Sequence, residues 1–534
     1  MSHIDILNLA FRMQEYDEIV FFGAGNYARW LQKELLKYNV QIDYFVVSKL
    51  EAKTENRING VPIYLFKDYV HEIQESNTIV VVAVSDIYER EIEASLIENS
   101  ISEYIFLSDY MSPQLNSNEE QNQSNHNDDI ILNKTAEWYL LYNKKPYSEI
   151  GNTIHEWKEW IAEKRKRNNE IVLVVMYPMP RFFKIVKALY ENNWKITILQ
   201  CPEMVDLSGY VENAKAYCDH YYECKCLEEV YYRLIQSTAS VAHLFSPWGY
   251  SALSNNLIRN KKLFPKIVFE TTDILAGMIA NIDEKWLKAE RYCLENADGV
   301  CCRGYELEYV KEYLGYKIKK DIVFMDYCND NCIVKNNEVE EELSLCYAGG
   351  IIFDDESLVA TKKIFLEIAK KAEEDKCHLH IYPRDWDEKK YFEFIELSKE
   401  SKYFHFHKPV PYWKLSKELS QYDYSICPVR KGFMDKKQGG CHINNKFIYG
   451  TTNQFFDALD AGIPIIASIP TKFLELFEKE EVVLKRTVEE YDFDEMRKLK
   501  KELRKNVEKA HEKYEMKKMI GKLINFYRTI VNEE

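Results

Sequence analysis

A segment near the C-terminal end of the chain, residues 452–468, carries the side chains best suited to holding a phosphorylated ligand. It reads TNQFFDALDAGIPIIAS, in which Thr452 or Asn453 can cap a helix that ends at Gly462. A helix N-terminus offers unpaired N–H groups and the positive end of the helix dipole, so this turn suits a diphosphate. Asp457, one turn further along, could accept hydrogen bonds from ribose hydroxyls. The same pattern also fits a helix that only packs on a sheet.

Two other groups of residues could contact a phosphate. Gly349 and Gly350 end the apolar run LSLCYAGG, and glycines at a strand end let the backbone approach a phosphate closely. The residues that follow them are acidic, so we expect the positive charge to come from Arg430 and Lys431 in the run CPVRKG. The alternative for these two side chains is a solvated loop.

A glycine-rich pattern also lies near the N-terminus. Gly23, Gly25 and Ala28, with Asn26 between them, form GxGxxA directly after the strand-like run EIVFFGAG and before a helix. This is the context of a dinucleotide-binding loop in a Rossmann-like domain. An NAD site also needs an acidic residue at the end of the second strand, where Ser48 stands instead. Ligand binding at this loop is therefore left open, and a redox role is less expected.

The cysteines and histidines predict no metal centre and no bound cofactor. The 13 cysteines all lie between Cys201 and Cys441 and include no CxxC pair, so we expect reduced thiols. His405 and His407 alternate on a strand and could share a face, but two imidazoles do not make a metal site.

Composition limits the classes of function. A formal net charge of −15 offers no footprint for nucleic acid. The N-terminal residues lack a basic region followed by an apolar core, and the longest apolar runs have the length of strands. We therefore expect a cytoplasmic protein with no transmembrane segment.

The elements that must position these side chains alternate between strands and helices. This alternation over 534 residues predicts an α/β fold of three Rossmann-like domains. The expected order is an N-terminal domain over 1–112, a flexible polar linker over 113–136, a second domain over 137–335, a third over 336–485, and C-terminal helices over 486–534 that cross back onto the second domain.

The helix that ends at Gly462 resembles the donor-binding segment of nucleotide-sugar glycosyltransferases of GT-B fold, of the group 1-like type, which often reads PNKLFEYLAAGKPVVAS. Asn453 and Phe456 fall in register with that segment, as does the glycine. By this resemblance Asp457 takes the place of the Glu that holds the donor ribose, and Gln454 takes that of a Lys.

The resemblance also assigns roles to the domains. It makes 137–335 the acceptor half and 336–485 the donor half, and the N-terminal domain is similar to small Rossmann modules found beside sugar-modifying enzymes. Many retaining relatives carry a His-Asp pair where this chain has Thr272 and Asp273. Asp273 is thus the candidate catalytic residue, which could orient a sugar hydroxyl or the acceptor, or could only cap a helix. Retaining and inverting chemistry both stay open.

The activity that the resemblance implies is metal-independent transfer of a sugar from a nucleotide-diphosphate sugar to a hydroxyl acceptor. The acceptor would be a glycan, a lipid-linked glycan or a protein, in bacterial surface glycan or glycoprotein synthesis. One alternative is a degenerate, non-catalytic GT-B protein that binds a nucleotide sugar or partners an active enzyme. Another is an NAD-dependent oxidoreductase that uses the N-terminal domain. The sugar, the base and whether the chain forms a homo-oligomer stay open.

Overall fold

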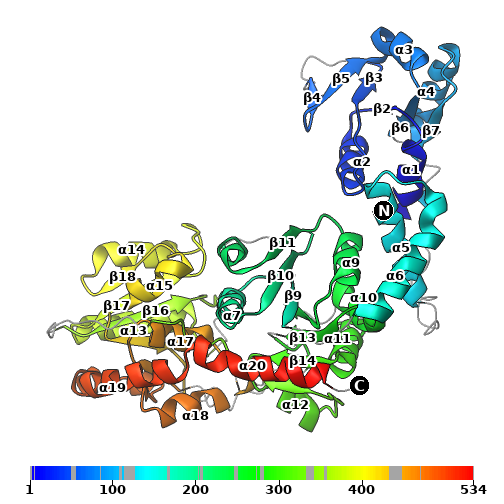
Figure 1. Cartoon of the computed structure of the whole chain (residues 1–534). Helices are drawn as coiled ribbons and strands as arrows, with labels where there is room; N and C mark the ends of the chain where they lie inside the picture. Colours follow the sequence, from blue (N-terminus) through cyan, green and yellow to red (C-terminus); the bar gives the residue numbers. More distant parts are fainter. Residues whose placement is uncertain are drawn as a thin grey trace. The chain divides into compact units, whose positions relative to one another are not determined.

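The computed structural model has two compact units, each built from parallel-dominated α/β structure (Figure 1). The smaller unit comprises Met1–Arg165 with Cys224–Ser237, and the larger comprises Lys166–Glu223 with Thr238–Glu534. Three sheets of this type confirm the predicted α/β class with three Rossmann-like folds. The structure describes residues 3–4, 6–49, 56–84, 86–107, 111–112, 127–164, 169–202, 204, 209–245, 251–271, 273–276, 282–331, 342–353, 358–431, 448–468 and 471–532.

The main sheet of the smaller unit has the strand order β4-β5-β3-β2-β6-β7, parallel except for the hairpin of β4 and β5. Asn59 and Gly60 join that hairpin with positive φ at both positions, as a two-residue I′ turn requires. The elements are α1 (Ile6–Met13), β2 (Glu18–Phe22), α2 (Asn26–Leu36), β3 (Tyr44–Val47), β4 (Arg57–Ile58), β5 (Val61–Leu65), α3 (Phe66–Glu75), β6 (Thr78–Val82), α4 (Asp86–Glu98) and β7 (Tyr104–Phe106), with β1 (His3–Ile4) pairing β8 (Met111–Ser112).

Helices complete the smaller unit. The first of them lies partly in the segment that was expected to be a flexible linker. The helix α5 (Asn127–Tyr142) covers the second part of the segment 113–136 and the start of the domain expected to begin at 137; residues 113–126 lie outside the described part of the chain. The reason is apolar burial: Trp138 is 1% exposed, and its Nε1 donates to Lys37 O at 3.2 Å.

The rest of the smaller unit also comes from the segment expected to form the second domain. It consists of η2 (Tyr147–Glu149), α6 (Ile150–Lys164) and α9 (Leu227–Gln236). Tyr232 of α9 stacks on Tyr139 of α5, with ring centroids 5.2 Å apart. These aromatic contacts hold α5, α6 and α9 together in one unit, so the second domain does not begin at 137.

The first sheet of the larger unit is parallel, with the strand order β11-β10-β9-β12-β13-β14-β15. Its central strands are mostly apolar and buried on both faces, as expected for a sheet covered by helices on each side. The strands are β9 (Glu170–Val175), β10 (Lys195–Gln200), β11 (His220–Glu223), β12 (Val241–Phe245), β13 (Lys266–Thr271), β14 (Gly299–Cys302) and β15 (Asp321–Val323). The helices are α7 (Pro180–Glu191), α8 (Tyr210–Ala214), α10 (Ala252–Arg259), α11 (Glu284–Asn296) and α12 (Glu306–Glu312).

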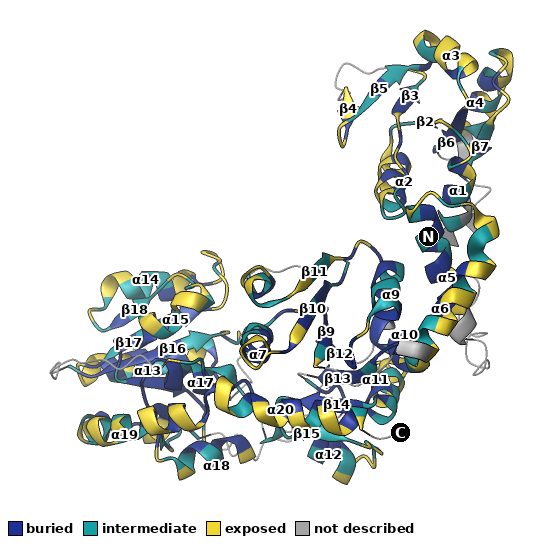
Figure 2. Ribbon diagram, in the orientation of Figure 1, coloured by how far each residue is buried: buried dark blue, intermediate teal, exposed yellow. Residues whose placement is uncertain are grey.

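The second sheet of the larger unit is also parallel, with the order β18-β17-β16-β19-β20-β21. Figure 2 shows buried residues along these strands and exposed residues on the outer faces of the helices. The strands are β16 (Ser344–Gly349), β17 (His378–Pro383), β18 (Phe404–Phe406), β19 (Tyr424–Cys427), β20 (Ile465–Ala467) and β21 (Val483–Leu484). The helices are α13 (Lys362–Glu374), α14 (Phe392–Glu400), α15 (Tyr412–Leu419), α17 (Asn453–Asp460) and α18 (Lys472–Lys479).

Two helices end the chain, α19 (Phe493–Lys513) and α20 (Met516–Val531), and α20 packs on α7 and β13 of the first sheet (Figure 1). The break between α19 and α20 lies where two backbone hydrogen bonds join it to Cys328. The N–H of Cys328 donates to Tyr514 O at 2.9 Å, and its carbonyl accepts from Met516 N at 2.9 Å. Cys328, which follows the first sheet, therefore lies beside Tyr514 and Met516, where the chain returns from the second sheet to the first. The expected boundary near residue 335 lies outside the described residues.

No helix in the described part of the chain combines the length and the apolar character needed to cross a bilayer.

Candidate functional site

A cavity of about 1200 Å³ in the larger unit is lined from both sheets. Parallel α/β sheets bind ligands at the carboxyl ends of their strands, and the lining residues follow strands in this way. Those from the first sheet include Tyr177 after β9, Asp273 after β13 and Arg303 after β14; those from the second include Gly349 and Gly350 at the end of β16, Arg384 after β17 and Pro428 after β19.

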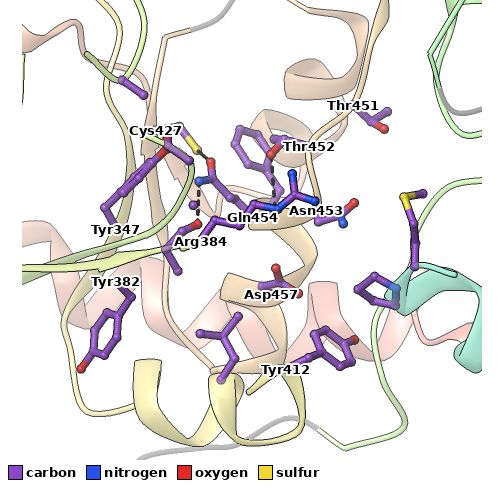
Figure 3. A pocket seen from close by; sticks show the side chains of 18 of the residues that line it. Tyr347, Tyr382, Arg384, Tyr412, Cys427, Thr451, Thr452, Asn453, Gln454 and Asp457 are labelled. Atoms are coloured by element: carbon purple, nitrogen blue, oxygen red, sulfur yellow. Dashed lines mark hydrogen bonds between the residues drawn. The ribbon is translucent and has the colours of Figure 1, made fainter. Parts of the chain in front are cut away.

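The helix α17 forms one wall of this cavity, as Figure 3 shows. Thr452 is its N-cap, with the side-chain Oγ1 accepting from Gln454 N at 3.3 Å. The apolar face of the helix is buried, and Phe455 and Phe456 pack against Phe473. Burial of that face directs the opposite side of the first turn toward the cavity.

Thr452, Asn453, Gln454 and Asp457, all predicted to bind the donor, line the cavity. The structure therefore brings the four together.

Gln454 fastens α17 to the glycine turn of the second sheet. Its Nε2 donates to Ala348 O at 2.7 Å, and its Oε1 accepts from the Cys427 thiol at 3.0 Å. Tyr347 closes the same turn by donating from its hydroxyl to Gly350 O at 2.5 Å. Gln454 thus holds two cavity walls together, a role that its position in the sequence did not indicate.

The packing at Gly349 leads to a test of this turn. A methyl group there would lie 2.4 Å from Gln454 Nε2 and 2.9 Å from the Tyr347 hydroxyl, whereas one at Gly350 would meet no atom within 4 Å. We expect Gly349→Ala to break the Gln454 hydrogen bond and to destabilise the protein by about 1 kcal/mol. Gly350→Ala, the matched control, should leave the melting temperature unchanged. Thermal denaturation of both variants checks this, and equal melting temperatures would contradict the packing described.

Asp457 is a partly exposed carboxyl on the cavity wall. Burial raises its pKa to about 7; Lys184 opposes this shift, and Asp460 adds to it. Lys184 lies on α7 of the first half, where its Nζ donates to Tyr327 O at 2.6 Å and lies 3.9 Å from Asp460 Oδ2. Near neutral pH, Asp457 can therefore exist as a hydrogen-bond donor or as an ionised acceptor.

Two arginines that the sequence analysis did not select provide positive charge at the cavity. Arg384 is exposed, and its side chain extends across the pocket in Figure 3. Arg303 is partly buried, and its Nη1 donates to Asn453 Oδ1 at 3.3 Å. Each comes directly after a strand in HLHIYPR or GVCCR, so the rule that ligands bind at carboxyl strand ends could have identified them.

Arg430 and Lys431 do not line the cavity, which corrects the source of positive charge expected for the phosphate. The Arg430 guanidinium lies 2.5 Å from Glu367 Oε2 and 3.5 Å from Glu489 Oε1, and Lys431 N donates to Glu489 at 2.9 Å. Glu367 and Glu489 therefore hold these two residues outside the cavity. These contacts could not be predicted, because the two glutamates are distant in the sequence.

Asp273, the candidate catalytic residue, lies on the first-sheet side of the cavity. Its Oδ1 is 3.8 Å from Arg303 Nη2. Thr272, which replaces the His of the retaining relatives, and the residues 277–281 of the helix that Asp273 was expected to cap lie outside the described residues. Within the cavity, Asp273 therefore lies beside the guanidinium of Arg303, which also contacts Asn453 of α17.

The N-terminal glycine loop has the expected form but lies in the smaller unit. Gly23 has φ of 112°, and a Cβ there would lie 2.7 Å from Val84 Cγ1, so the turn requires glycine. Gly25 is the N-cap of α2, Asn26 is exposed, and Ala28 is buried in the core. These residues explain the strand-to-helix turn without a ligand.

No protein-family model matches the sequence, and no curated protein matches it. Among solved structures, a glycosyltransferase from Rickettsia africae is similar with a TM-score of 0.47 at 12% identity, over 69% of this chain and 100% of the other. A sucrose-phosphate synthase from Thermosynechococcus elongatus gives 0.46 at 14% identity, over 68% and 99%. A UDP-GlcNAc 2-epimerase from Neisseria meningitidis bound to UDP-GlcNAc gives 0.40 at 12% identity, over 67% and 100%.

Two features of the larger unit define its architecture. Two parallel sheets contribute strand ends to one cavity, and α20 returns from the second half to pack on the first. The larger unit therefore consists of two Rossmann-like α/β domains that line one cavity, the architecture that the resemblance to GT-B enzymes implies.

Proposed function

We propose that the protein transfers a sugar from a nucleotide-diphosphate sugar to a hydroxyl acceptor. The observation that carries this proposal is the convergence, in one cavity, of the N-terminal turn of α17, the carboxyl of Asp457, the glycine turn at 349–350 and the guanidinium of Arg384. These groups match two parts of such a donor: a helix N-terminus and an arginine suit the diphosphate, and a carboxylate suits the ribose hydroxyls.

The proposed chemistry is electrostatic stabilisation of the departing nucleoside diphosphate. Arg384 and the N–H groups of α17 would neutralise the charge that develops on the leaving oxygen, the function that a metal ion fulfils in other sites. The acceptor would enter from the wall that carries Tyr177 and Asp273. In this proposal, Asp273 orients the acceptor hydroxyl or a hydroxyl of the transferred sugar.

The finer assignment belongs to the same proposal and rests on the resemblance of residues 452–468. It is metal-independent hexosyl transfer in the cytoplasm, to a glycan, lipid-linked or protein acceptor of bacterial surface glycan or glycoprotein synthesis. Donor binding without turnover would instead support the non-catalytic alternative.

The test is release of nucleoside diphosphate from a panel of UDP-, GDP-, CDP- and TDP-sugars by the full-length protein, measured with and without simple sugar acceptors. Many transferases hydrolyse their donor slowly when no acceptor is present, so we expect one base to support release. Tight binding of one donor with no release under any condition would reject catalysis and retain binding. Release that depends on added NAD would favour the oxidoreductase alternative.

Arg384 provides a second test. It decides whether the positive charge that binds the diphosphate comes from Arg384 or, as the sequence predicted, from Arg430. We expect Arg384→Gln to weaken binding of the nucleoside diphosphate by about tenfold or more, since a charge-assisted hydrogen bond contributes about 1.5–3 kcal/mol. Arg430→Gln, outside the cavity, is the matched control and should leave affinity unchanged. Isothermal titration calorimetry measures both, and a loss confined to Arg430→Gln would contradict the proposed site.

A further inference from the structure

Four histidines converge on the two neighbouring strands β17 and β18. His378 and His380 alternate along β17, and His405 and His407 alternate along β18 and beyond its end. The parallel register pairs His380 with His405, so side chains two residues apart lie on the same face of both strands. All four are partly buried. The fold thus combines two short histidine pairs into one cluster.

The imidazole nitrogens of this cluster form hydrogen-bonded pairs, and ligands of one metal ion have similar separations. His378 Nδ1 lies 2.9 Å from His405 Nε2, and His380 Nδ1 lies 3.0 Å from His407 Nε2. Ligand nitrogens of His378, His380 and His405 all lie within 4.8 Å of one another. Imidazole nitrogens bind zinc at about 2.0–2.1 Å, so adjacent ligands around one ion are separated by about 3 Å. Small rotations of the rings would direct their lone pairs to a common point.

A carboxylate orients the first of these rings. Glu342 Oε2 lies 2.7 Å from His378 Nε2, and Lys402 Nζ is 3.3 Å from Glu342 Oε1, so this carboxylate is held in place and ionised. When His378 Nε2–H donates to Glu342, the lone pair is on Nδ1, which faces His405. Metal-binding histidines commonly donate their other N–H to a carboxylate in this way.

We propose that His378, His380 and His405 bind one divalent transition-metal ion of the zinc and copper group, with His407 at the edge of the site and Glu342 in support. Imidazole ligands select these ions over magnesium and calcium, which prefer oxygen. The inference does not depend on the proposed function.

The site adjoins the cavity without being part of it. Tyr382, which lines the cavity, stacks on His407 with ring centroids 4.3 Å apart and an interplanar angle of 6°. The bound ion would therefore hold the edge strand β18 and the side chain of Tyr382 in place. Its role would be structural, and it would take no part in the transfer of the sugar.

The test is calorimetric titration of the untagged full-length protein, stripped with a chelator, with Zn²⁺. We expect a single ion per chain, and we expect the double variant His380→Ala/His405→Ala to bind about tenfold or more weakly. The control is His71→Ala, an exposed histidine of α3. Zinc binding that the double variant retains in full, or no binding by the wild-type protein, would overturn the proposal.

A second measurement does not require the variants to fold. In the electron paramagnetic resonance spectrum of the wild-type protein with Cu²⁺, we expect hyperfine splitting from several imidazole nitrogens. A spectrum with oxygen ligands alone would reject the histidine site. Zinc should also raise the melting temperature of the wild-type protein and of His71→Ala but not that of the double variant, because a ligand of the folded state stabilises it.

Discussion

The Asp457→Asn variant is expected to lose about a hundredfold or more in kcat/KM for the nucleotide sugar, because two charge-assisted hydrogen bonds to ribose contribute about 1.5–3 kcal/mol each. Asparagine keeps the shape of the side chain on the cavity wall but offers one carbonyl oxygen instead of a carboxylate. Donor-release kinetics with the preferred sugar nucleotide measure the loss.

The fold should not suffer from this substitution. The pKa of Asp457 is raised in the folded protein, so ionising it opposes folding as the pH rises from the unfolded pKa, about 4, to about 7. Asparagine has no such cost, and the variant should melt no lower than wild type at pH 8. The matched control is Asp494→Asn, whose side chain is 80% exposed on α19. Unchanged turnover in Asp457→Asn would remove the residue from the site.

The same carboxyl predicts how donor affinity varies with pH. Ribose hydroxyls donate best to the ionised form, which dominates above a pKa of about 7. Affinity should therefore be highest above pH 7 and should fall as the pH decreases through 7. Asp457→Asn should show no such change over the same range. Calorimetric titrations at pH 6, 7 and 8 compare the two proteins.

Removing the buried guanidinium of Arg181 should produce the largest loss of stability. Arg181 is 1% exposed at the start of α7; its Nε and Nη2 donate to the Glu270 carboxylate at 3.2 and 3.1 Å, and its Nη1 donates to Met325 O at 2.8 Å. Burial would raise the pKa of Glu270, but the guanidinium lowers it overall, so the carboxylate stays ionised. We expect Arg181→Met to cost about 3–5 kcal/mol, because it leaves that charge buried without its guanidinium, and only His243 Nε2 remains beside it, 3.2 Å from Glu270 Oε2.

Chemical denaturation followed by circular dichroism measures this cost. The control is Arg291→Met: Arg291 is half-exposed and pairs with Glu295 along α11, where an ion pair contributes about 0–1 kcal/mol. Adding Glu270→Gln to Arg181→Met should recover part of the loss, since it removes the buried charge that Arg181 had balanced. Equal stabilities of Arg181→Met and Arg291→Met would show that the buried pair does not hold the first sheet together.

The parts of the fold that could be predicted are those governed by local pattern. The strands β9 and β20 come from apolar runs rich in β-branched residues, and Gly462 ends α17 with φ of 70°. The placement of Asp457 on the cavity wall followed from the helix period. These features depend on residues that are close together in the chain, so they can be predicted from the sequence alone.

The parts that could not be predicted depend on contacts between distant residues. Arg430 was expected at the phosphate because it follows a strand, but Glu367 and Glu489, far away in the chain, hold it elsewhere. The helix break at Tyr514 arises from backbone pairing with Cys328. The histidine cluster requires the β17 and β18 register, which brings together residues about 27 positions apart. The start of α5 was predicted as part of a linker because that segment is polar, and the buried residues of the helix come later in it.

The most direct measurement is calorimetric titration of the full-length protein with UDP, GDP, CDP, TDP and NAD, repeated with Arg384→Gln and Asp457→Asn. We predict that one nucleoside diphosphate binds with a stoichiometry of one per chain, that both substitutions weaken it, and that NAD does not compete with it. If no nucleoside diphosphate binds, or if the one that binds is unaffected by both substitutions, the cavity beside α17 is not a donor site.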